Sequence, residues 1–281
     1  MNRIKLFADS TSDLPREKIK QYNIEIIPLY INFNETSYKD GVDLTVSEMY
    51  KMVEEKNSLP KTAAPSPGDY YNAFKQYIDN GDDIIYIGIS SKLSSSVQNA
   101  LIAASEFPEG RIEVIDSFNL STGIGLLVLK AADLIEEGLD IKEIVSVLKT
   151  GVANVKAAFL IDTLDYLYMG GRCNSLESFF GGVLKIKPIV NVVDGGMILG
   201  QKSRGKRQKA LEMLLKTALD NINTIDAGRI FVPHSMSYDD AVYLKEQLEA
   251  HVDNEILITE AGCVISSHCG PGTVGIMYIS K

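Results

Sequence analysis

Five serines crowd into one short stretch of this sequence, Ser90–Ser96, where only Lys92 and Leu93 interrupt them. A charge-free apolar run, Ile84–Ile89, precedes the serines and is typical of a strand that is covered on both faces. Apolar residues then recur at helical spacing from Val97 onward. The stretch therefore predicts a strand, a polar loop and a helix. Hydroxyls and free backbone N–H groups beside a helix N-terminus suit an anion.

Polar chemistry gathers in three further loops, Asp9–Asp13, Thr62–Pro67 and Ser266–Thr273. The first two follow or border strand patterns in the same half of the chain as the serines. We expect these loops to converge with the serines on one rim of a sheet, the usual ligand site of open α/β folds. The last of these loops, Ser266–Thr273, lies in the second half of the chain, which predicts a site between two domains. A simpler interpretation, in which one serine only caps the helix, stays open from the serine stretch alone.

Strand and helix patterns alternate through the first half, which predicts a parallel, doubly wound α/β domain. The strands are expected at Ile4–Ala8, Ile24–Phe33, Ile84–Ile89 and Ile112–Ile115. The first helix is expected to end near Tyr22, with Ser12 or Asp13 as its cap. Further helices are expected at Ser47–Glu55, at Gly68–Asp79, from Val97 onward, and at Thr122–Glu137, which has an amphipathic pattern. Between them, Lys61–Pro67 is expected to be a rigid loop, because its prolines disfavour strand pairing.

The second half has a different pattern. Asp194-Gly195-Gly196 separates two short apolar segments and is a strong hairpin signal, which indicates a mixed sheet. The expected strands are Ala157–Ile161, Ile189–Val193, Met197–Leu199, Arg229–Pro233, Glu255–Thr259 and Val274–Ile279, and the expected helices Ser175–Leu184, Lys206–Asn221 and Tyr238–Ala250. The predicted fold class is α/β, with an N-terminal three-layer α/β/α domain (1–153) and a C-terminal α/β domain with a mixed sheet (154–281).

Charge and cysteine content exclude several classes of protein. The formal net charge of −9 argues against nucleic-acid binding, which needs a basic surface. No apolar run approaches the length of a membrane span and no signal peptide is recognisable, so we expect no stable membrane insertion. The 3 cysteines form no CxxC pair, which favours a reducing compartment. Together these features predict a cytoplasmic protein.

A serine hydrolase is the enzymatic alternative, with Ser94 as nucleophile and His268 as base. The usual α/β-hydrolase signal is G-x-S-x-G, whereas the chain has G-I-S-S-K at this loop. Histidine and cysteine positions lack the spacing of a zinc site, so no metal site is expected.

Two basic features remain. Arg172 follows Gly170-Gly171, which allows a tight turn and a fixed guanidinium; a structural turn with a surface arginine is the alternative. The run Lys202–Lys209 is either a solvated face or the contact for an acidic partner.

Over essentially its whole length the chain resembles the DegV family, bacterial fatty-acid-binding proteins that serve as carrier subunits of fatty acid kinase. The matching motifs are D-S-T-S-D-L (Asp9–Leu14), K-T-A-A-P-S-P (Lys61–Pro67), I-S-S-K-L-S (Ile89–Ser94), L-D-Y-L-Y-M-G-G-R (Leu164–Arg172), K-I-K-P-I-V (Lys185–Val190), K-S-R-G-K (Lys202–Lys206) and H-C-G-P-G-T-V-G (His268–Gly275). Their order makes the resemblance specific. It implies an N-terminal α/β/α domain and a C-terminal α/β domain that hold a fatty acid between them.

The resemblance also implies roles for single residues. Thr62 and Ser94 match the hydroxyls that bind the carboxylate, Arg172 matches the arginine after the paired glycines, and His268 matches a polar residue near the pocket mouth. Arg204 also matches a residue near the mouth and is the expected contact for the kinase. Ser95 is counted with the fatty-acid-binding residues.

The sequence departs from the family at two places next to this site. Ser95-Ser96-Val97-Gln98 stands where the family often has G-T-Y-Q, and Cys173-Asn174 stands where Ile-Ser is more usual. These differences bear on the acyl-chain preference.

The implied function is that of a carrier. It binds a long-chain fatty acid and presents the carboxylate to a separate fatty acid kinase catalytic subunit, which makes an acyl phosphate. The chain has no G-x-x-x-x-G-K-[ST] loop, so we expect no kinase activity of its own and no cofactor besides the bound lipid. Burial of about fifteen methylenes at about 0.8 kcal/mol each offers roughly 12 kcal/mol before binding costs. Candidates for the wall of the acyl channel are Phe179, Phe180, Val183 and Leu184.

Overall fold

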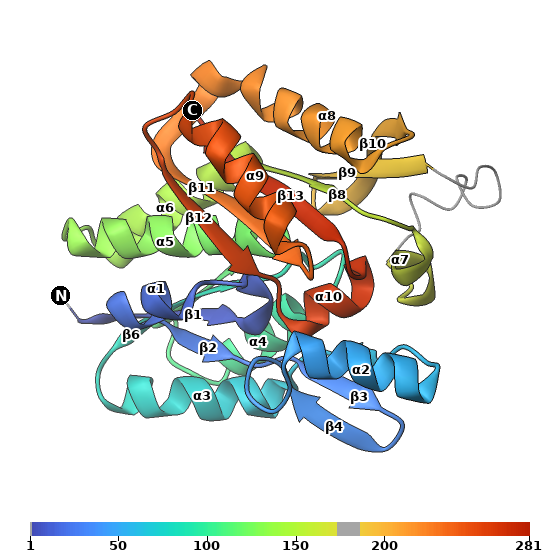
Figure 1. Cartoon of the computed structure of the whole chain (residues 1–281). Helices are drawn as coiled ribbons and strands as arrows, with labels where there is room; N and C mark the ends of the chain where they lie inside the picture. Colours follow the sequence, from blue (N-terminus) through green and yellow to red (C-terminus); the bar gives the residue numbers. More distant parts are fainter. Residues whose placement is uncertain (1, 173–185) are drawn as a thin grey trace.

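The computed structural model describes residues 2–172 and 186–281, whose strands form three sheets (Figure 1). The first sheet is parallel, in the order β2 (Glu25–Ile27), β1 (Ile4–Asp9), β6 (Asp83–Gly88) and β7 (Ile112–Asp116). Alternate residues of its central strands enter different cores, because side chains point to opposite faces along a strand. Leu6 and Ile85 pack with α5 (Thr122–Glu136) and α6 (Ile141–Gly151), whereas Phe7 and Ile84 pack with α3 (Pro67–Asp79) and α4 (Ser96–Ala104). This confirms the three-layer arrangement.

The largest sheet belongs to the C-terminal part and is mixed, as expected. Its order is β10 (Gly196–Arg204), β9 (Ile186–Val193), β8 (Val155–Leu160), β13 (Thr273–Ser280), β11 (Ile225–Ser235) and β12 (Glu255–Glu260). The β9–β10 hairpin turns at Asp194 (φ 48°) and Gly195 (φ 78°), the left-handed pair that a two-residue hairpin requires. Helices α8 (Arg207–Leu219) and α9 (Tyr238–Glu249) pack against one face of the sheet.

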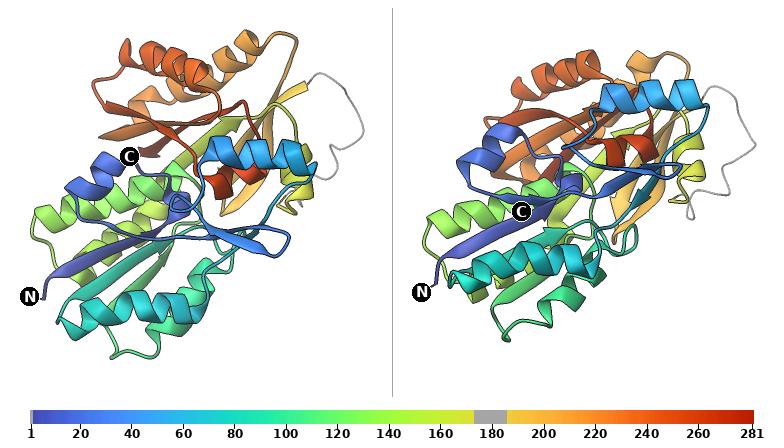
Figure 2. Two further views of the ribbon diagram at one scale, coloured as in Figure 1. Left: turned by 60° about the horizontal axis from the view of Figure 1, so that its bottom comes forward. Right: turned by 90° about the horizontal axis from the view of Figure 1, so that it is seen from below.

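Helix α5 lies between the two large sheets (Figures 1 and 2). It contacts β1 and β6 on one side and β8, β11 and β13 on the other. Eleven of its fifteen residues are buried, so the expected amphipathic pattern is wrong for this helix. A helix that is apolar on nearly all sides is the kind that lies inside a protein rather than on its surface.

Two segments between the first strands differ from expectation. The predicted strand Ile24–Phe33 is divided at Pro28, which has no N–H to donate, into β2 and β3 (Tyr30–Phe33). These strands lie in different sheets, since β3 pairs with β4 (Thr36–Lys39) and β5 (Lys61–Ala63). The expected Lys61–Pro67 loop therefore begins as a strand, which ends before its first proline, Pro65. Neither Ser12 nor Asp13 caps α1 (Arg16–Gln21), whose N-cap is Pro15.

Other differences are helical. The predicted loop Ser266–Thr273 begins inside α10 (Cys263–Cys269), and α6 was not expected at all. Helix α10 lies between β12 and β13 in sequence, but its Cys263 and Val264 pack into the core formed by α2 (Val46–Lys56) and β3. The predicted helix Ser175–Leu184, with the four candidate wall residues, lies outside the described residues. Among those that are described, no helix is long and apolar enough to cross a membrane.

Candidate functional site

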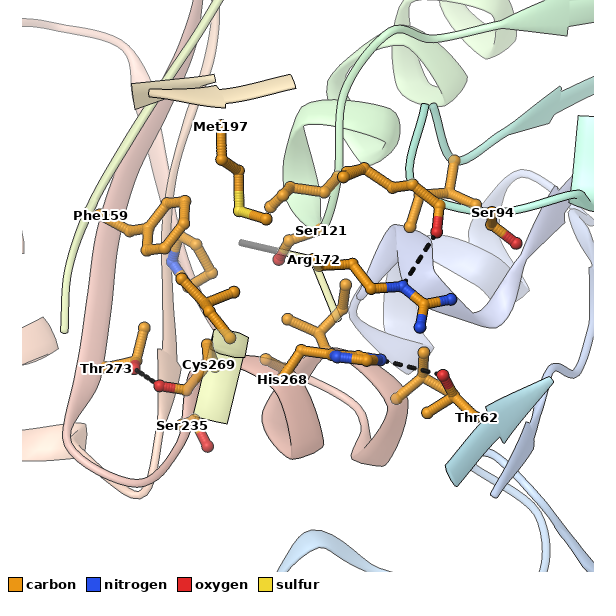
Figure 3. A pocket seen from close by; sticks show the side chains of 18 of the residues that line it. Thr62, Ser94, Ser121, Phe159, Arg172, Met197, Ser235, His268, Cys269 and Thr273 are labelled. Carbon is orange, nitrogen blue, oxygen red and sulfur yellow. Dashed lines mark hydrogen bonds between the residues drawn. The ribbon is translucent and has the colours of Figure 1, made fainter. Parts of the chain in front are cut away.

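A narrow apolar cavity lies between the N-terminal and C-terminal parts of the chain (Figure 3). The empty space inside it is about 810 Å³ including the open mouth, but the centre of a water molecule can reach only about 80 Å³ of it. The cavity is therefore a slender channel, shaped for a thin apolar ligand. Its apolar walls include Leu29, Ile89, Leu93, Leu120, Phe159, Leu167, Met197, Val264, Ile265 and Met277.

Strand alternation in the C-terminal sheet produces much of this wall. Along β13, Thr273, Gly275 and Met277 line the cavity, whereas Val274 and Ile276 point to the opposite face and pack under α8 and α9. Phe159 of β8 and Met197 of β10 add large side chains to the same surface. The sequence pattern of these strands was recognised, but only the sheet order shows which of their faces meets the N-terminal part.

Four polar side chains that were predicted as site residues meet at one end of the cavity, namely Thr62, Ser94, Arg172 and His268 (Figure 3). Thr62 lies on β5 and His268 near the end of α10, and Thr62 Oγ1 hydrogen-bonds His268 Nε2 at 2.9 Å. The structure thus joins residues that are 206 positions apart in sequence. Ser94 comes from the loop between β6 and α4.

Two carbonyl groups orient the guanidinium of Arg172. Its Nε donates to the Leu93 carbonyl at 3.2 Å, and its Nη1 donates to the Gly170 carbonyl at 2.8 Å. The arginine therefore connects the serine loop to the end of α7 (Asp165–Met169). A cation fixed in this way beside hydroxyl groups is suited to a carboxylate or a phosphate.

His268 is held in its neutral form. Burial, together with the neighbouring Arg172 charge, lowers its pKa to about 4. Its Nδ1 is buried and has no hydrogen-bond partner within the described residues. Gly170 makes this packing possible, because a Cβ at that position would collide with Nδ1. At neutral pH the imidazole can therefore support Thr62 without adding a second positive charge.

The serine loop does more than cap a helix. Ser95 occupies the N-cap of α4 but makes no side-chain cap hydrogen bond, and it is exposed and does not line the cavity. Ser94 is partly buried, and its Oγ lies 2.9 Å from Ser96 Oγ. Ser90 donates its hydroxyl to the Gly195 carbonyl at 2.7 Å and so ties the loop to the β9–β10 hairpin.

Asp13, in the first polar loop, connects the two parts of the chain. Its carboxylate accepts hydrogen bonds from the Gly262 N–H at 2.8 Å and the Ser121 hydroxyl at 2.6 Å. Burial raises its pKa well above the usual range. Asp40 likewise accepts from the Cys263 N–H at 2.8 Å. These carboxylates hold the N-terminus of α10, a role that sequence reasoning did not identify because both partners are more than 200 residues away.

The expected partner contact, Arg204, lies outside the cavity lining and is exposed at the end of β10. Lys202, Lys206 and Lys209 are exposed as well, and together with Arg204 we call them the basic cluster. Arg207 is a structural member of the same run, since it forms ion pairs with Asp162 and Asp240 at 2.6 Å.

The geometry gives no support to the serine-hydrolase alternative. Ser94 bonds to Ser96 rather than to His268, whose Nε2 is engaged by Thr62. Among the described residues, no carboxylate bonds to His268 Nδ1, as one would to orient a general base. In the part of the chain that is described, no three His, Cys, Asp or Glu side chains group as metal ligands.

Known proteins resemble this chain over its full length. A family model described as "Uncharacterised protein, DegV family" matches residues 3–281. A DegV domain-containing protein of Caldanaerobacter subterraneus subsp. tengcongensis is 36% identical over 100% of both chains. One of Clostridium perfringens is 34% identical, again over 100% of both chains.

Solved structures agree with the sequence matches. A DegV family protein from Thermus thermophilus, described by its fatty acid binding, superposes with a TM-score of 0.93 and 34% identity, covering 99% of this chain and 100% of its own. A stearic acid-binding protein from Eubacterium ventriosum has a TM-score of 0.89 and 28% identity over 100% and 99% of the chains. The family model and the full-length relatives together show that this chain belongs to the DegV family.

Proposed function

We propose that the chain binds a long-chain fatty acid between its N-terminal domain, residues 1–153, and its C-terminal domain, residues 154–281. The observation that carries this proposal is the slender apolar cavity that ends at Thr62, Ser94, Arg172 and His268. Its shape and lining suit an acyl tail, and its hydroxyls and guanidinium suit a carboxylate. The fatty acid and stearic acid named for the Thermus and Eubacterium proteins support the same assignment.

The two ends of the ligand contribute differently. Burial of the tail supplies most of the affinity, because each methylene removed from water contributes about 0.8 kcal/mol. The head group sets the direction in which the ligand lies. Thr62 and Ser94 donate to the carboxylate, and Arg172 balances its charge at the mouth. Ser95, which is exposed beside Ser94, belongs to the edge of this site rather than to its lining.

The position of the carboxylate indicates how the bound lipid is used. Placed at an open mouth, it is accessible to a separate fatty acid kinase catalytic subunit, which would form an acyl phosphate. The basic cluster offers that acidic or phosphate-handling partner an exposed contact, in which we expect Arg204 to take part. The chain itself has no phosphate-binding loop motif, so its part is to carry and present the lipid in the cytoplasm.

The first prediction concerns the purified protein. Native mass spectrometry should show the chain carrying one fatty acid, because a long buried tail dissociates slowly from a narrow cavity. After the lipid is stripped, an added long-chain fatty acid should bind again at one per chain. A chain that purifies without lipid and binds none when offered it contradicts the proposed function.

The second prediction concerns the head group. Ser94→Ala should weaken binding of dodecanoate by about 1.5–3 kcal/mol, the usual loss of a hydrogen bond to a charged group, or roughly 10- to 150-fold. Longer lipid should still survive purification, because the tail interactions remain. Titration calorimetry measures the affinity, and Ser95→Ala is the matched control, expected to bind as the wild type does. Equal affinity in Ser94→Ala and the wild type would remove Ser94 from the head-group site.

A further inference from the structure

Arg207, at the start of α8, bonds to three other segments of the C-terminal part that are far apart in sequence. Its Nη1 donates to Asp162 Oδ1 at 2.6 Å, and its Nε donates to Asp240 Oδ2, also at 2.6 Å. Its Nη2 donates to the Gly272 carbonyl at 2.5 Å and to the Ser237 hydroxyl oxygen at 2.9 Å. All three nitrogen atoms of the guanidinium are therefore engaged.

Two of these segments lead to the head-group site. Asp162 lies in the connection between β8 and α7, and α7 is followed closely by Arg172. Gly272 lies in the turn between α10 and β13, shortly after His268. Arg207 thus holds the start of the segment that carries Arg172 and the end of the segment that carries His268. Arg207 itself lies outside the cavity lining, so it can act on a ligand only through the residues it holds.

Two glycines allow these segments to pack closely. Gly272 has φ 78°, and a Cβ there would lie 2.8 Å from Asp162 Oδ2. Gly270 has φ 79°, and a Cβ there would lie 2.7 Å from the ring of Tyr166 in α7. The turn between α10 and β13 is therefore packed directly against Asp162 and α7. Because packed side chains transmit displacement, a shift of one of these segments is passed to the other.

We propose that Arg207 is a positioning residue for the head-group site, and that its hydrogen bonds set the preference for a carboxylate head over an uncharged one. The inference rests on the proposed function and names a residue outside the cavity that determines the class of ligand. A guanidinium presents its donors in a rigid plane, so it can hold several acceptors at defined angles, which a lysine ammonium on a flexible stem cannot. Charge-assisted hydrogen bonds to a carboxylate depend in turn on where their donors are placed.

A simple charge effect makes the opposite prediction for one variant. If the negative charge of Asp162 acted on a bound carboxylate through space, it would repel it, and Asp162→Ala should strengthen binding. In our proposal Asp162 is instead an anchor, because Arg207 and Lys187 both donate to its Oδ1 at 2.6 Å. Removal of that anchor should weaken binding. The sign of the change therefore separates positioning from charge.

The third prediction compares decanoate, which is ionised at pH 7.5, with decan-1-ol, which has the same tail and no charge. Titration calorimetry gives both affinities for the delipidated chain. Arg207→Met and Asp162→Ala should each weaken decanoate about tenfold, because a misaligned charge-assisted bond keeps only part of its strength, and should leave decan-1-ol within about twofold of the wild type. Arg207→Lys should weaken decanoate as Arg207→Met does, because it keeps the charge but loses the rigid fork.

Arg229→Met is the matched control. Arg229 is another partly buried arginine of the C-terminal sheet, and its guanidinium donates to Asp133 at 2.6 Å and to the Tyr22 hydroxyl oxygen at 2.8 Å. These bonds join the two parts of the chain, but Arg229 lies outside the cavity lining. The variant should melt at a lower temperature than the wild type and keep the same ratio of decanoate to decan-1-ol affinity.

The outcomes separate the two proposals. Equal losses of decanoate and decan-1-ol in Arg207→Met would show that Arg207 only stabilises the fold, and an unchanged decanoate affinity would show that it positions nothing; either result overturns the inference. Stronger decanoate binding in Asp162→Ala, or wild-type binding in Arg207→Lys, would assign the effect to charge and overturn it too. If thermal melting shows Arg207→Met to be unfolded, the other two variants decide. A wild type that binds neither ligand and carries no lipid in native mass spectrometry contradicts the proposed function itself.

Discussion

Replacing Met197 with tryptophan should weaken the binding of dodecanoate roughly thirtyfold, whereas the same replacement at Ile198 should leave it unchanged. Met197 is buried on β10 and lines the cavity, but Ile198, the next residue along the strand, is 42% exposed. Neighbouring strand residues point to opposite faces, so this pair differs mainly in which side of the sheet receives the larger ring. Tryptophan would occupy the space of roughly three methylenes, which lowers affinity by about 2 kcal/mol, or roughly thirtyfold.

The comparison needs two measurements on each variant. Native mass spectrometry gives the fraction of chains that purify with lipid, and calorimetry with dodecanoate gives the affinity. Thermal melting identifies any general loss of stability, which would affect binding for a different reason. Wild-type affinity for dodecanoate in a folded Met197→Trp variant would show that the acyl tail does not pass along the C-terminal sheet, and would place it elsewhere.

Arg204→Glu should leave the bound fatty acid unchanged but reduce acyl-phosphate formation by the cognate kinase tenfold or more. Arg204 is exposed and does not line the cavity, so its charge does not reach the tail or its walls. Reversing a charge at a protein interface replaces attraction with repulsion and slows association. Because salt screens exposed charges, the defect should become smaller as ionic strength rises.

Lys130→Glu is the matched control for this charge reversal, since Lys130 is an exposed lysine of α5 outside the basic cluster. It should leave both lipid content and turnover unchanged. An Arg204→Glu protein without lipid would assign Arg204 to the lipid site instead. Normal lipid content with normal turnover would show that the basic cluster is only a solvated face.

Much of the fold can be predicted from local patterns in the sequence. The apolar run Ile84–Ile89 predicted β6 within one residue at each end, because a strand buried on both faces has no place for charge. Asp194-Gly195 predicted the hairpin, because a two-residue turn requires positive φ at both positions. The seven ordered motifs indicated the family and, through it, Thr62, Ser94, Arg172 and His268.

The assembled site depends on contacts between residues that are distant in sequence. Thr62 meets His268 only because β5 joins the small sheet beside α10, although its flanking prolines indicated a loop. The contact between Asp13 and Gly262 likewise has no sequence signature, since 249 positions separate the two residues. Local propensity acts over a few residues, whereas burial and hydrogen bonding across layers depend on how the layers pack. The sequence by itself determined most strands of the two large sheets, the hairpin and the polar residue types. Tertiary packing alone decided which of those residues face the cavity and which buried groups contact them.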